Sequence, residues 1–596
     1  MNATSAEVSR SRAQQTMNRA DSGYTIDQPL TQILDTETEQ KGHPEEQIQA
    51  GPLQDRKFLL IASGIVVVAL LLRLYRIGEQ EFWFDEAYSF SMVAMPNWTA
   101  RALVDSNPPL YYLLLRGWAA FAGQSEAGLR LLSAGFGTLF VVAVIWAGRV
   151  LFTPQVGLWS GGFTAVAPMH IYYSQEARTY TLFTLALLLT YTTLWRALQK
   201  NTRASWALVS ASALLALYSH YFAILGLFPT AFLLLLWPKQ EIATRHWLAY
   251  AGAALLSGLL FLPWLLWAFV LTPHSLVAVA WLQNFWERMS LLLVIPKSLE
   301  AIGLGGQAKP VSLLAMKQFA RLEFPSSIRV LGLGLLLLLG TWVALPWGDS
   351  RLGVPWLEKR KAWLGMLLFL PLVALLLVSF YKPVYMIGRY DMVAFPAYAL
   401  LIGLALAKVQ QIKTAGPVLA SIVALALLIP IGTKLVLYYQ APSDGSAQAT
   451  AGILHASVDN GDVVVLTGAG GLTPLYYLYR LGYRWEEKQC RNELADRNFS
   501  CRFFPRDYEL PYFTVGADPS RGLKPIGAIQ EDVQDYLRPL RSRTGGIWVV
   551  LGSYIYVEGQ LIGSKNDLYL LKELSRSGLR FVPKEIVPTI FQFVRS

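Results

Sequence analysis

Runs of about 20 apolar residues recur along the chain and alternate with short polar segments. A helix of that length spans the hydrocarbon core of a bilayer. Because the bilayer offers the backbone no hydrogen-bond partners, such runs must be helical. The pattern therefore predicts a polytopic α-helical membrane protein with spans near residues 58–77, 128–150, 155–173, 179–198, 204–219, 222–238, 246–269, 328–347, 363–381, 392–409 and 416–438.

Two segments leave the number of spans open. The stretch 108–121 (PPLYYLLLRGWAAF) is too short for a span and is expected to form a helix at the membrane surface. The stretch 270–327 combines an apolar piece, SLLLVI, with several charges, so it forms either an outer loop with surface helices or two further spans. Both alternatives keep the same alternation of sides, and the prediction is about 11 spans, or 13 if 270–327 crosses twice.

Positive charges set the expected orientation, because basic residues are enriched in cytoplasmic loops. Alternation from a cytoplasmic N-terminus places in the inside loops Arg149, Arg196, Lys200, Arg203, Lys239, Arg245, Arg351, Lys359, Arg360, Lys361, Lys408 and Lys413. We therefore expect a multi-pass protein of the plasma (inner) membrane of a bacterium. The net charge of +11 belongs to these loops and gives no reason to expect nucleic acid as a partner.

The two ends of the chain differ from its apolar middle. Residues 1–54 are polar, lack an apolar periodicity and are expected to form a disordered cytoplasmic tail. Residues 440–596 mix polar and apolar positions and lie outside by the count of spans. The pattern there predicts a small α/β extracytoplasmic domain, with strands at 462–466 and 547–551 and a helix at 472–482.

Composition agrees with this division. With 54% hydrophobic and 15% charged residues, the chain has too little charge to cover a soluble protein of 596 residues. Its only two cysteines, Cys490 and Cys501, both lie in the C-terminal region. In an oxidising compartment a disulfide between them is expected, with two free thiols as the alternative.

Polar and aromatic residues gather in four places that this orientation puts on the outer side: 82–90 (FWFDEAYSF) with 105–112 (DSNPPLYY), 169–180 (MHIYYSQEARTY), 218–222 (YSHYF) and 381–391 (YKPVYMIGRYD). Tyrosine and tryptophan are common anchors at membrane interfaces, which explains many of the aromatic residues, Tyr88 among them. The adjacent acids Asp85 and Glu86 are harder to explain, because burial and like charge both disfavour ionised carboxylates.

These clusters together predict an acidic catalytic group beside an anion-binding site. A helix or turn would point Asp85 and Glu86 in different directions, so the two need not share one role. Arg178, Lys382 and Arg389 face the same compartment and are suited to bind phosphate.

Six segments in this order resemble the family 39-like glycosyltransferases of the GT-C superfamily, which include protein O-mannosyltransferases and bacterial lipid A aminoarabinose transferases: FWFDEAYS, NPPLYYLLLRGW, LRLLSAGFGTLF, YYSQEARTYTL, YSHYF and RYDMVAFPAY. The resemblance extends over most of 58–410 and implies a GT-C transmembrane domain at 55–439. It departs from the family at Asn107, where a His usually precedes PPL, and this weakens a metal or proton role for that position.

The resemblance implies an enzyme that moves a sugar from a polyprenyl-phosphate carrier to a glycan, lipid or protein acceptor on the outer face, with the lipid tail between the spans. In this family an acidic residue of the first outer loop acts as catalytic base or binds the acceptor. Asp85 matches that residue, and Glu86 beside it is expected to assist.

Phosphate leaves readily, so such an enzyme needs a base for the acceptor hydroxyl and cations for the departing phosphate. Attack opposite the phosphate would invert the anomeric centre. Expected phosphate contacts are Arg178, Lys382 and Arg389, and expected substrate contacts are Tyr88, Asn107, Glu176, His220, Tyr221 and Tyr390. A divalent cation is an open alternative, because Asp85, Glu86 and His220 offer suitable ligand types although their spacing forms no metal signature.

Two other functions remain open at this point. A transporter or flippase for lipid-linked sugars would place ionisable residues near the middle of the spans. In this sequence the charges gather at the ends of the spans instead. A non-catalytic relative whose C-terminal domain binds glycans is also compatible with the resemblance.

Overall fold

The computed structural model describes residues 52–94, 107–268, 291–305, 326–345 and 354–441, apart from position 383, together with short stretches within 443–595. The chain divides into two units, Met1–Arg56 and Lys57–Ser596, and the contacts described below all lie within the second. The tail predicted at 1–54 therefore falls almost entirely outside the described residues.

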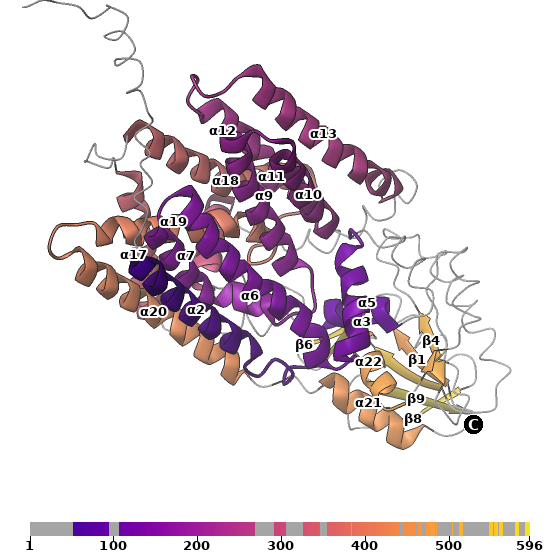
Figure 1. Cartoon of the computed structure of the whole chain (residues 1–596). Helices are drawn as coiled ribbons and strands as arrows, with labels where there is room; N and C mark the ends of the chain where they lie inside the picture. The colour runs from indigo at the N-terminus through magenta and orange to yellow at the C-terminus, as the bar shows by residue number, and fades with distance from the viewer. Residues whose placement is uncertain are drawn as a thin grey trace, which may run out of the picture. The chain divides into compact units, whose positions relative to one another are not determined.

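Helices make up most of the described chain (Figure 1). The apolar runs predicted as spans fall mainly on helix, and eight helices of the described part are long and apolar enough to cross a membrane. The helices of this region are α2 (Pro52–Leu74), α3 (Phe84–Ala94), α5 (Leu110–Ala122), α6 (Glu126–Leu151), α7 (Pro154–Val166), α8 (Pro168–Ser174), α9 (Tyr180–Lys200), α10 (Arg203–Ser219), α11 (Ala223–Leu227), η1 (Phe228–Thr230), α12 (Ala231–Leu236), α13 (Thr244–Leu266), η4 (Leu291–Leu293), α15 (Val294–Leu304), α17 (Ser326–Ala344), α18 (Val354–Tyr381), η6 (Tyr390–Ala394), α19 (Phe395–Gln410) and α20 (Gly416–Gln440).

Two of the predicted spans are interrupted helices. The run 155–173 is divided into α7 and α8 at Ala167, which has an extended backbone and is followed by Pro168. The run 222–238 is divided into α11, η1 and α12 around Pro229. Proline disfavours helix in the preceding residue, which explains the break at Ala167. At Pro229 the preceding Phe228 keeps a helical backbone, and the proline, which lacks a backbone N–H, lies in a 3₁₀ turn between α11 and α12.

A buried arginine satisfies the carbonyl groups at the first of these breaks. Arg73, near the end of α2, is fully buried and donates to Thr164 O at 3.2 Å and to Ala165 O at 3.2 Å. The same guanidinium contacts Ser174 Oγ at 3.1 Å and His170 Nδ1 at 2.9 Å. These contacts join α2 to α7 and α8 and account for the buried histidine, His170, as a packing residue.

The centre of the bundle is formed by α9 and α19. Their most apolar stretches are 83% and 94% buried, whereas that of α2 is 11% buried, so α2 lies at the periphery. α19 packs closely against α7, because a Cβ atom added at Gly403 would lie 2.0 Å from Ser160 Oγ and 2.7 Å from Val156 O. The glycine thus lets the two backbones approach.

We expect Gly403→Ala to destabilise the bundle, because the added methyl group would force α7 and α19 apart. Overpacking of this kind costs about 1–3 kcal/mol. The thermal unfolding midpoint of the purified protein in detergent measures the effect. Gly365→Ala on α18 is the matched control, because a Cβ atom there has no neighbour within 4 Å; equal midpoints for the two variants would contradict the prediction.

The two segments whose role the sequence left open contain short helices. α5, in the segment predicted to lie at the membrane surface, has 13 residues, which at 1.5 Å per residue is about 20 Å and too short to span a bilayer. α15, within 270–327, has 11 residues and contacts α8, α17, α18, α19 and α20. The rest of 270–327, up to Pro325, falls outside the described residues except for 291–305.

The C-terminal region contains a five-stranded mixed sheet of order β4-β1-β5-β9-β8. β1 is parallel to both β4 and β5, and the strands predicted at 462–466 and 547–551 are its central pair β1 and β5. β9 runs antiparallel to β5 and β8. The strands and helices of this region are α21 (Ser446–Ser457), β1 (Val463–Thr467), α22 (Leu472–Arg480), β2 (Arg484–Trp485), β3 (Phe503–Phe504), β4 (Tyr512–Val515), β5 (Ile547–Leu551), β6 (Tyr554–Val557), β7 (Gln560–Gly563), β8 (Leu579–Val582) and β9 (Ile590–Arg595).

An apolar core joins this region to the start of the helical bundle. Buried side chains of α3, α5, α21, α22, β1 and β5 pack into one cluster, and Figure 1 shows α22 beside α3. Cys490 and Cys501 lie outside the described residues, so the disulfide stays a prediction, as does the extracytoplasmic position of the domain 440–596.

Candidate active site

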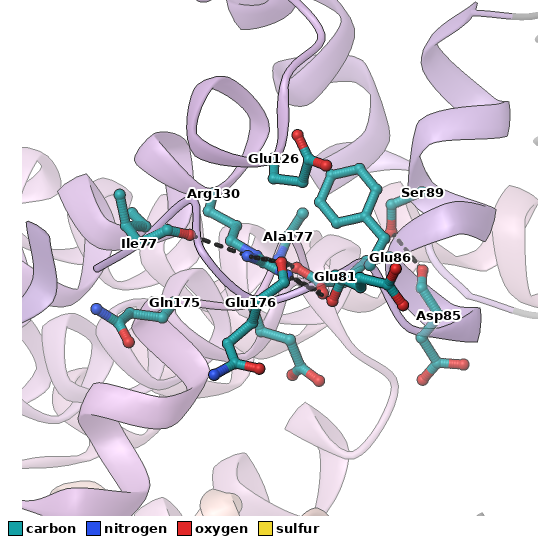
Figure 2. A network of polar contacts seen from close by, with 12 residues as sticks. Ile77, Glu81, Asp85, Glu86, Ser89, Glu126, Arg130, Gln175, Glu176 and Ala177 are labelled. Atoms are coloured by element: carbon teal, nitrogen blue, oxygen red, sulfur yellow. Dashed lines mark hydrogen bonds and ion pairs between the residues drawn. The ribbon is translucent and has the colours of Figure 1, made fainter. Parts of the chain in front are cut away.

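Asp85 and Glu86 lie in the first turn of α3 and point in different directions (Figure 2). An α-helix turns about 100° per residue, so neighbouring side chains cannot share one face. Glu86 turns toward Arg130, while the carboxylate of Asp85 lies on another side of the helix. The two acids therefore have different environments, as their adjacency in the sequence predicted.

Glu86 forms a buried, bidentate ion pair with Arg130 of α6. Arg130 Nε and Nη2 donate to Glu86 Oε1 and Oε2, each at 2.7 Å, and Ala177 N donates to Oε1 at 2.9 Å. Both side chains are at most 3% exposed. The carboxylate thus accepts hydrogen bonds from three protein donors, which favours a structural role for Glu86, while its expected assistance in catalysis stays a prediction.

Arg130 also binds the loop that leads into α3. Its guanidinium donates to the backbone carbonyls of Ile77 at 2.9 Å, Gln80 at 2.8 Å and Glu81 at 3.1 Å. Together with the two bonds to Glu86, these contacts hold the first turn of α3 against α6. Asp85 therefore stands on a rigidly anchored turn.

Asp85 is paired with two arginines that are distant in the sequence. Arg389 Nη2 forms an ion pair with Asp85 Oδ2, and Arg178 Nη2 lies 3.8 Å from the same oxygen. The side chains of both arginines are at most 8% exposed. Burial by itself would raise the pKa of Asp85, but the charges of Arg389 and Arg178 outweigh it, and the net pKa lies below the usual value.

Aromatic rings enclose the guanidinium of Arg389. Its carbon lies 5.4 Å from the ring centroid of Trp83 and 5.6 Å from those of Tyr180 and Tyr390, and Arg389 Nε donates to the Tyr180 hydroxyl. Cation–π contacts of this kind stabilise a guanidinium that is removed from water. The arrangement fixes the cation where an anionic group could reach it from the side of Asp85.

Two buried donors beside Asp85 have no hydrogen-bond partner among the described residues. They are Arg178 Nε and Trp83 Nε1. Arg178 donates through Nη1 to Tyr112 OH at 2.9 Å, so its plane is held in place while Nε stays unpaired. Unpaired buried donors are rare in folded proteins and are typical of sites that bind polar ligands.

Glu176 is a third buried acid of this site. Its Oε1 accepts from Tyr172 OH at 3.4 Å, and its Oε2 has no hydrogen-bond partner within the described part of the chain. Figure 2 shows Glu176 and Asp85 extending to the same side of the network, away from Arg130. Burial and, next, the negative charge of Glu86 raise the pKa of Glu176 to about 8, so the carboxyl group is protonated at neutral pH.

We expect Glu176→Gln to flatten the pH dependence of stability. The carboxyl pKa is about 8 in the folded protein against 4.5 for a glutamate side chain in water, so the folded protein binds the proton more tightly. This contribution is fully present below about pH 4.5 and is lost as pH rises through about 8. Thermal midpoints of both proteins, measured from pH 5 to pH 9 in detergent, should fall more steeply for the wild type; parallel curves would contradict the assignment.

His220 closes the site from the end of α10. Its Nδ1 accepts from Phe222 N at 3.1 Å, and its ring lies 5.2 Å from that of Tyr221 and 6.2 Å from that of Tyr390. Burial, followed by the charges of Arg178 and Arg389, lowers the pKa of His220 to about 3, so it is neutral. Two of the predicted substrate contacts, His220 and Tyr390, thus lie near the arginine pair, and the third, Tyr221, contacts the ring of His220.

The remaining predicted residues have different positions. Tyr88 lies one turn beyond Asp85 on α3, with its ring 6.3 Å from that of Tyr112, the partner of Arg178. Asn107 is half-buried just before α5. Lys382 follows the last residue of α18, and its expected contact with the phosphate stays a prediction.

No group of three or more His, Cys, Asp or Glu side chains in the described residues is arranged to hold a metal ion. Asp85, Glu86 and His220, the ligand types considered from the sequence, do not form a common set, because Glu86 is occupied by Arg130. Sequence reasoning assigned no role to Arg130, Tyr112, Tyr180 or Trp83. A usable signal existed for Arg130, because it is a charge within the predicted span 128–150.

Comparisons with known proteins agree on the architecture. Residues 106–267 match the family of dolichyl-phosphate-mannose-protein mannosyltransferases. The structure is similar to ArnT from Cupriavidus metallidurans bound to undecaprenyl phosphate, with 12% identity and a TM-score of 0.53, and to the apo state of the same protein, with 14% identity and a TM-score of 0.51. Each comparison covers 90% of this chain and 98% of ArnT. No curated protein matches the sequence.

The chain has the GT-C fold. The GT-C fold that the sequence motifs implied is thereby confirmed, and the chain is a multi-pass helical membrane protein. Within this GT-C fold, Arg130, Glu176, Arg178 and His220 all lie in the stretch that matches the mannosyltransferase family, whereas Asp85 and Arg389 lie on either side of it.

Proposed function

We propose that this protein is an integral membrane glycosyltransferase that moves a monosaccharide from a polyprenyl-phosphate carrier to an acceptor hydroxyl on the extracytoplasmic face. The observation that carries the proposal is a carboxylate, Asp85, whose side chain is 13% exposed and is held beside the two buried guanidinium groups of Arg178 and Arg389. Asp85 can act as a base, and the two guanidinium groups beside it can bind an anion. The mannosyltransferase match and the GT-C fold support the same reaction class.

In the proposed reaction, Asp85 takes the proton of the acceptor hydroxyl as its oxygen attacks the anomeric carbon of the sugar. The bond between that carbon and the phosphate oxygen breaks, and its electron pair leaves with the polyprenyl phosphate. Attack from the face opposite the phosphate inverts the anomeric configuration. General-base catalysis of this type contributes about 10²- to 10⁴-fold to the rate.

Arg389 links donor binding to the basicity of Asp85. In the structure its guanidinium is paired with the carboxylate, and this charge is one cause of the lowered pKa of Asp85. A donor phosphate competes for the same guanidinium, because arginine binds phosphate oxygens as well as it binds carboxylates. Binding of the donor would therefore release Asp85 and raise its pKa, which makes it a stronger base only when the donor is present.

The unpaired donors next to Asp85 fit a polar substrate. Arg178 Nε and Trp83 Nε1 can each donate to a phosphate or sugar oxygen, and the neutral carboxyl group of Glu176 can donate its proton in a hydrogen bond. Fixed donors of this kind stabilise the negative charge that develops on a leaving phosphate. The surrounding rings of Tyr180, Tyr390 and His220 offer apolar faces on which a sugar can stack.

The positions of the charges argue against the alternative function of a transporter. The buried cations Arg73, Arg130 and Lys408 lie near the ends of the candidate spans α2, α6 and α19, whereas the buried Lys434 lies within the candidate span α20. A transporter would hold such groups near the membrane midplane to bind its cargo. The acid and the two arginines of the proposed site lie outside the candidate spans altogether.

A transfer assay tests the proposal. The purified protein in detergent is supplied with a panel of radiolabelled polyprenyl-phosphate monosaccharides and with host membrane extract as acceptor. Label that moves from one donor into the extract, with an inverted anomeric configuration in the product, would support the proposal and identify the sugar. Absence of transfer from every donor by correctly folded protein would reject it.

A further inference from the structure

The loop that precedes Asp85 is held from the C-terminal region as well as from the bundle. The Glu81 carboxylate accepts from Gln448 N at 2.9 Å and from Ala447 N at 3.3 Å. These are amides of the first turn of α21, where the helix dipole favours a negative charge. The acid thus caps α21 from another part of the chain, and it does so four residues before Asp85.

α22 contacts the same loop through a second pair of residues. Phe82 N donates to the Tyr477 hydroxyl at 3.2 Å. The ring of Tyr476 lies 4.5 Å from that of Phe82 and 4.8 Å from that of Phe90. Phe82 precedes α3 and Phe90 lies two turns along it, so one tyrosine of α22 supports both ends of the helical stretch that carries Asp85.

The hydroxyl group of Tyr476 extends this support to α6. It lies 2.9 Å from Glu126 Oε2 and 3.2 Å from Gln124 O, at the start of the helix that also carries Arg130. The rings of Phe82, Phe90 and Tyr476 are at most 1% exposed. Aromatic pairs at such distances contribute about 0.5–1.5 kcal/mol each beyond the area that they bury. α3 is therefore fixed between Arg130 on one side and α22 on the other.

We propose that α21 and α22 of the C-terminal region position Asp85 for catalysis, acting through Glu81, Phe82 and the buried face of α3. The expected effect of this support on kcat rests on the proposed glycosyl transfer, whereas its expected effect on the order of α3 does not. Catalytic groups must be held closely in place, because a misplacement of about 1 Å can cost 10²-fold in rate. Arg178 and Arg389 lie on other elements, so donor binding should be spared when the support of α22 is lost.

Three variants of the full-length protein test this inference. Tyr476→Ala removes both ring contacts and the hydroxyl bond, while Tyr476→Phe keeps the rings. Val549→Ala is the matched control, because Val549 of β5 is fully buried in the C-terminal region but is not part of the cluster that includes α3. Hydrogen–deuterium exchange of peptides covering 82–94 is measured for each variant, together with kcat and KM for the donor.

In Tyr476→Ala we expect amides of 82–94 to exchange at least about tenfold faster and kcat to fall about tenfold or more, with KM for the donor unchanged. Tyr476→Phe should stay near the wild type in both measurements, and Val549→Ala should lower the thermal midpoint without changing either. Wild-type exchange at 82–94 in Tyr476→Ala would overturn the inference, as would equally fast exchange in Val549→Ala. A further outcome is a wild type that transfers no sugar from any donor while exchange at 82–94 is faster only in Tyr476→Ala. That pair of results would support the structural link and would reject the proposed function.

Discussion

The Asp85→Asn variant is expected to lose about 10²- to 10⁴-fold in kcat, the range that a positioned general base contributes. Asparagine keeps the shape of the side chain but cannot take a proton from the acceptor hydroxyl. It also no longer competes with phosphate for Arg389, which is paired with Asp85 in the structure. KM for the lipid-linked donor should therefore stay the same or fall. Initial rates at varied donor concentration separate the two parameters.

Glu79→Gln is the matched control for this variant. Glu79 is an acid of the loop before α3, its side chain is 52% exposed, and it pairs with Arg76 at the surface. Exposed pairs of this kind contribute little to stability, about 0–1 kcal/mol. Its transfer rate should equal that of the wild type. If Asp85→Asn kept a rate within a few fold of the wild type, Asp85 would be removed from the chemical step.

The second large effect concerns stability. Arg130→Met should destabilise the protein by about 3–5 kcal/mol, because removing one partner of a buried ion pair leaves an uncompensated charge, here that of Glu86. The same change also releases the three carbonyl groups of the loop before α3. Thermal unfolding in detergent should show a midpoint well below that of the wild type, with a loss of folded protein after purification.

The double variant Glu86→Gln/Arg130→Met distinguishes charge from packing. Without the carboxylate charge, the methionine no longer faces a buried anion, so the double variant should unfold at a higher temperature than Arg130→Met alone. A coupling energy between the two sites follows from the four midpoints of the cycle. A double variant as unstable as Arg130→Met would show that the loop contacts, and not the ion pair, dominate.

Much of the architecture follows from local patterns in the sequence. Apolar runs of span length predicted the helices of the bundle, and short continuous apolar runs predicted the strands β1 and β5. The divergence of Asp85 and Glu86 also followed from local geometry, because neighbouring residues of a helix cannot point the same way. Pro168 and Pro229 could have signalled the two breaks, but the prediction followed the continuous apolar runs 155–173 and 222–238.

The partners of the acids could not be predicted in the same way. Glu86 meets Arg130 across 44 positions, and Asp85 meets Arg389 across 304, so only tertiary packing decides which cation meets which acid. Arg178, Lys382 and Arg389 were equivalent by type and expected side of the membrane. The structure distinguishes them, because the first and the third pair with Asp85 whereas Lys382 follows the end of α18.

The fully buried Arg73 has a consequence for how the protein is made. α2 is synthesised well before α7 and α8, whose carbonyl groups and histidine bind the Arg73 guanidinium in the folded protein. An arginine at the centre of a membrane helix costs about 2.5–3.5 kcal/mol on insertion scales, and Arg73, in the last turn of α2, carries part of this cost while its partners are missing. We therefore expect α2 to reach its final depth only once α7 and α8 have entered the bilayer. During that interval the nascent chain should keep Arg73 near the lipid headgroups, or in contact with the insertion machinery.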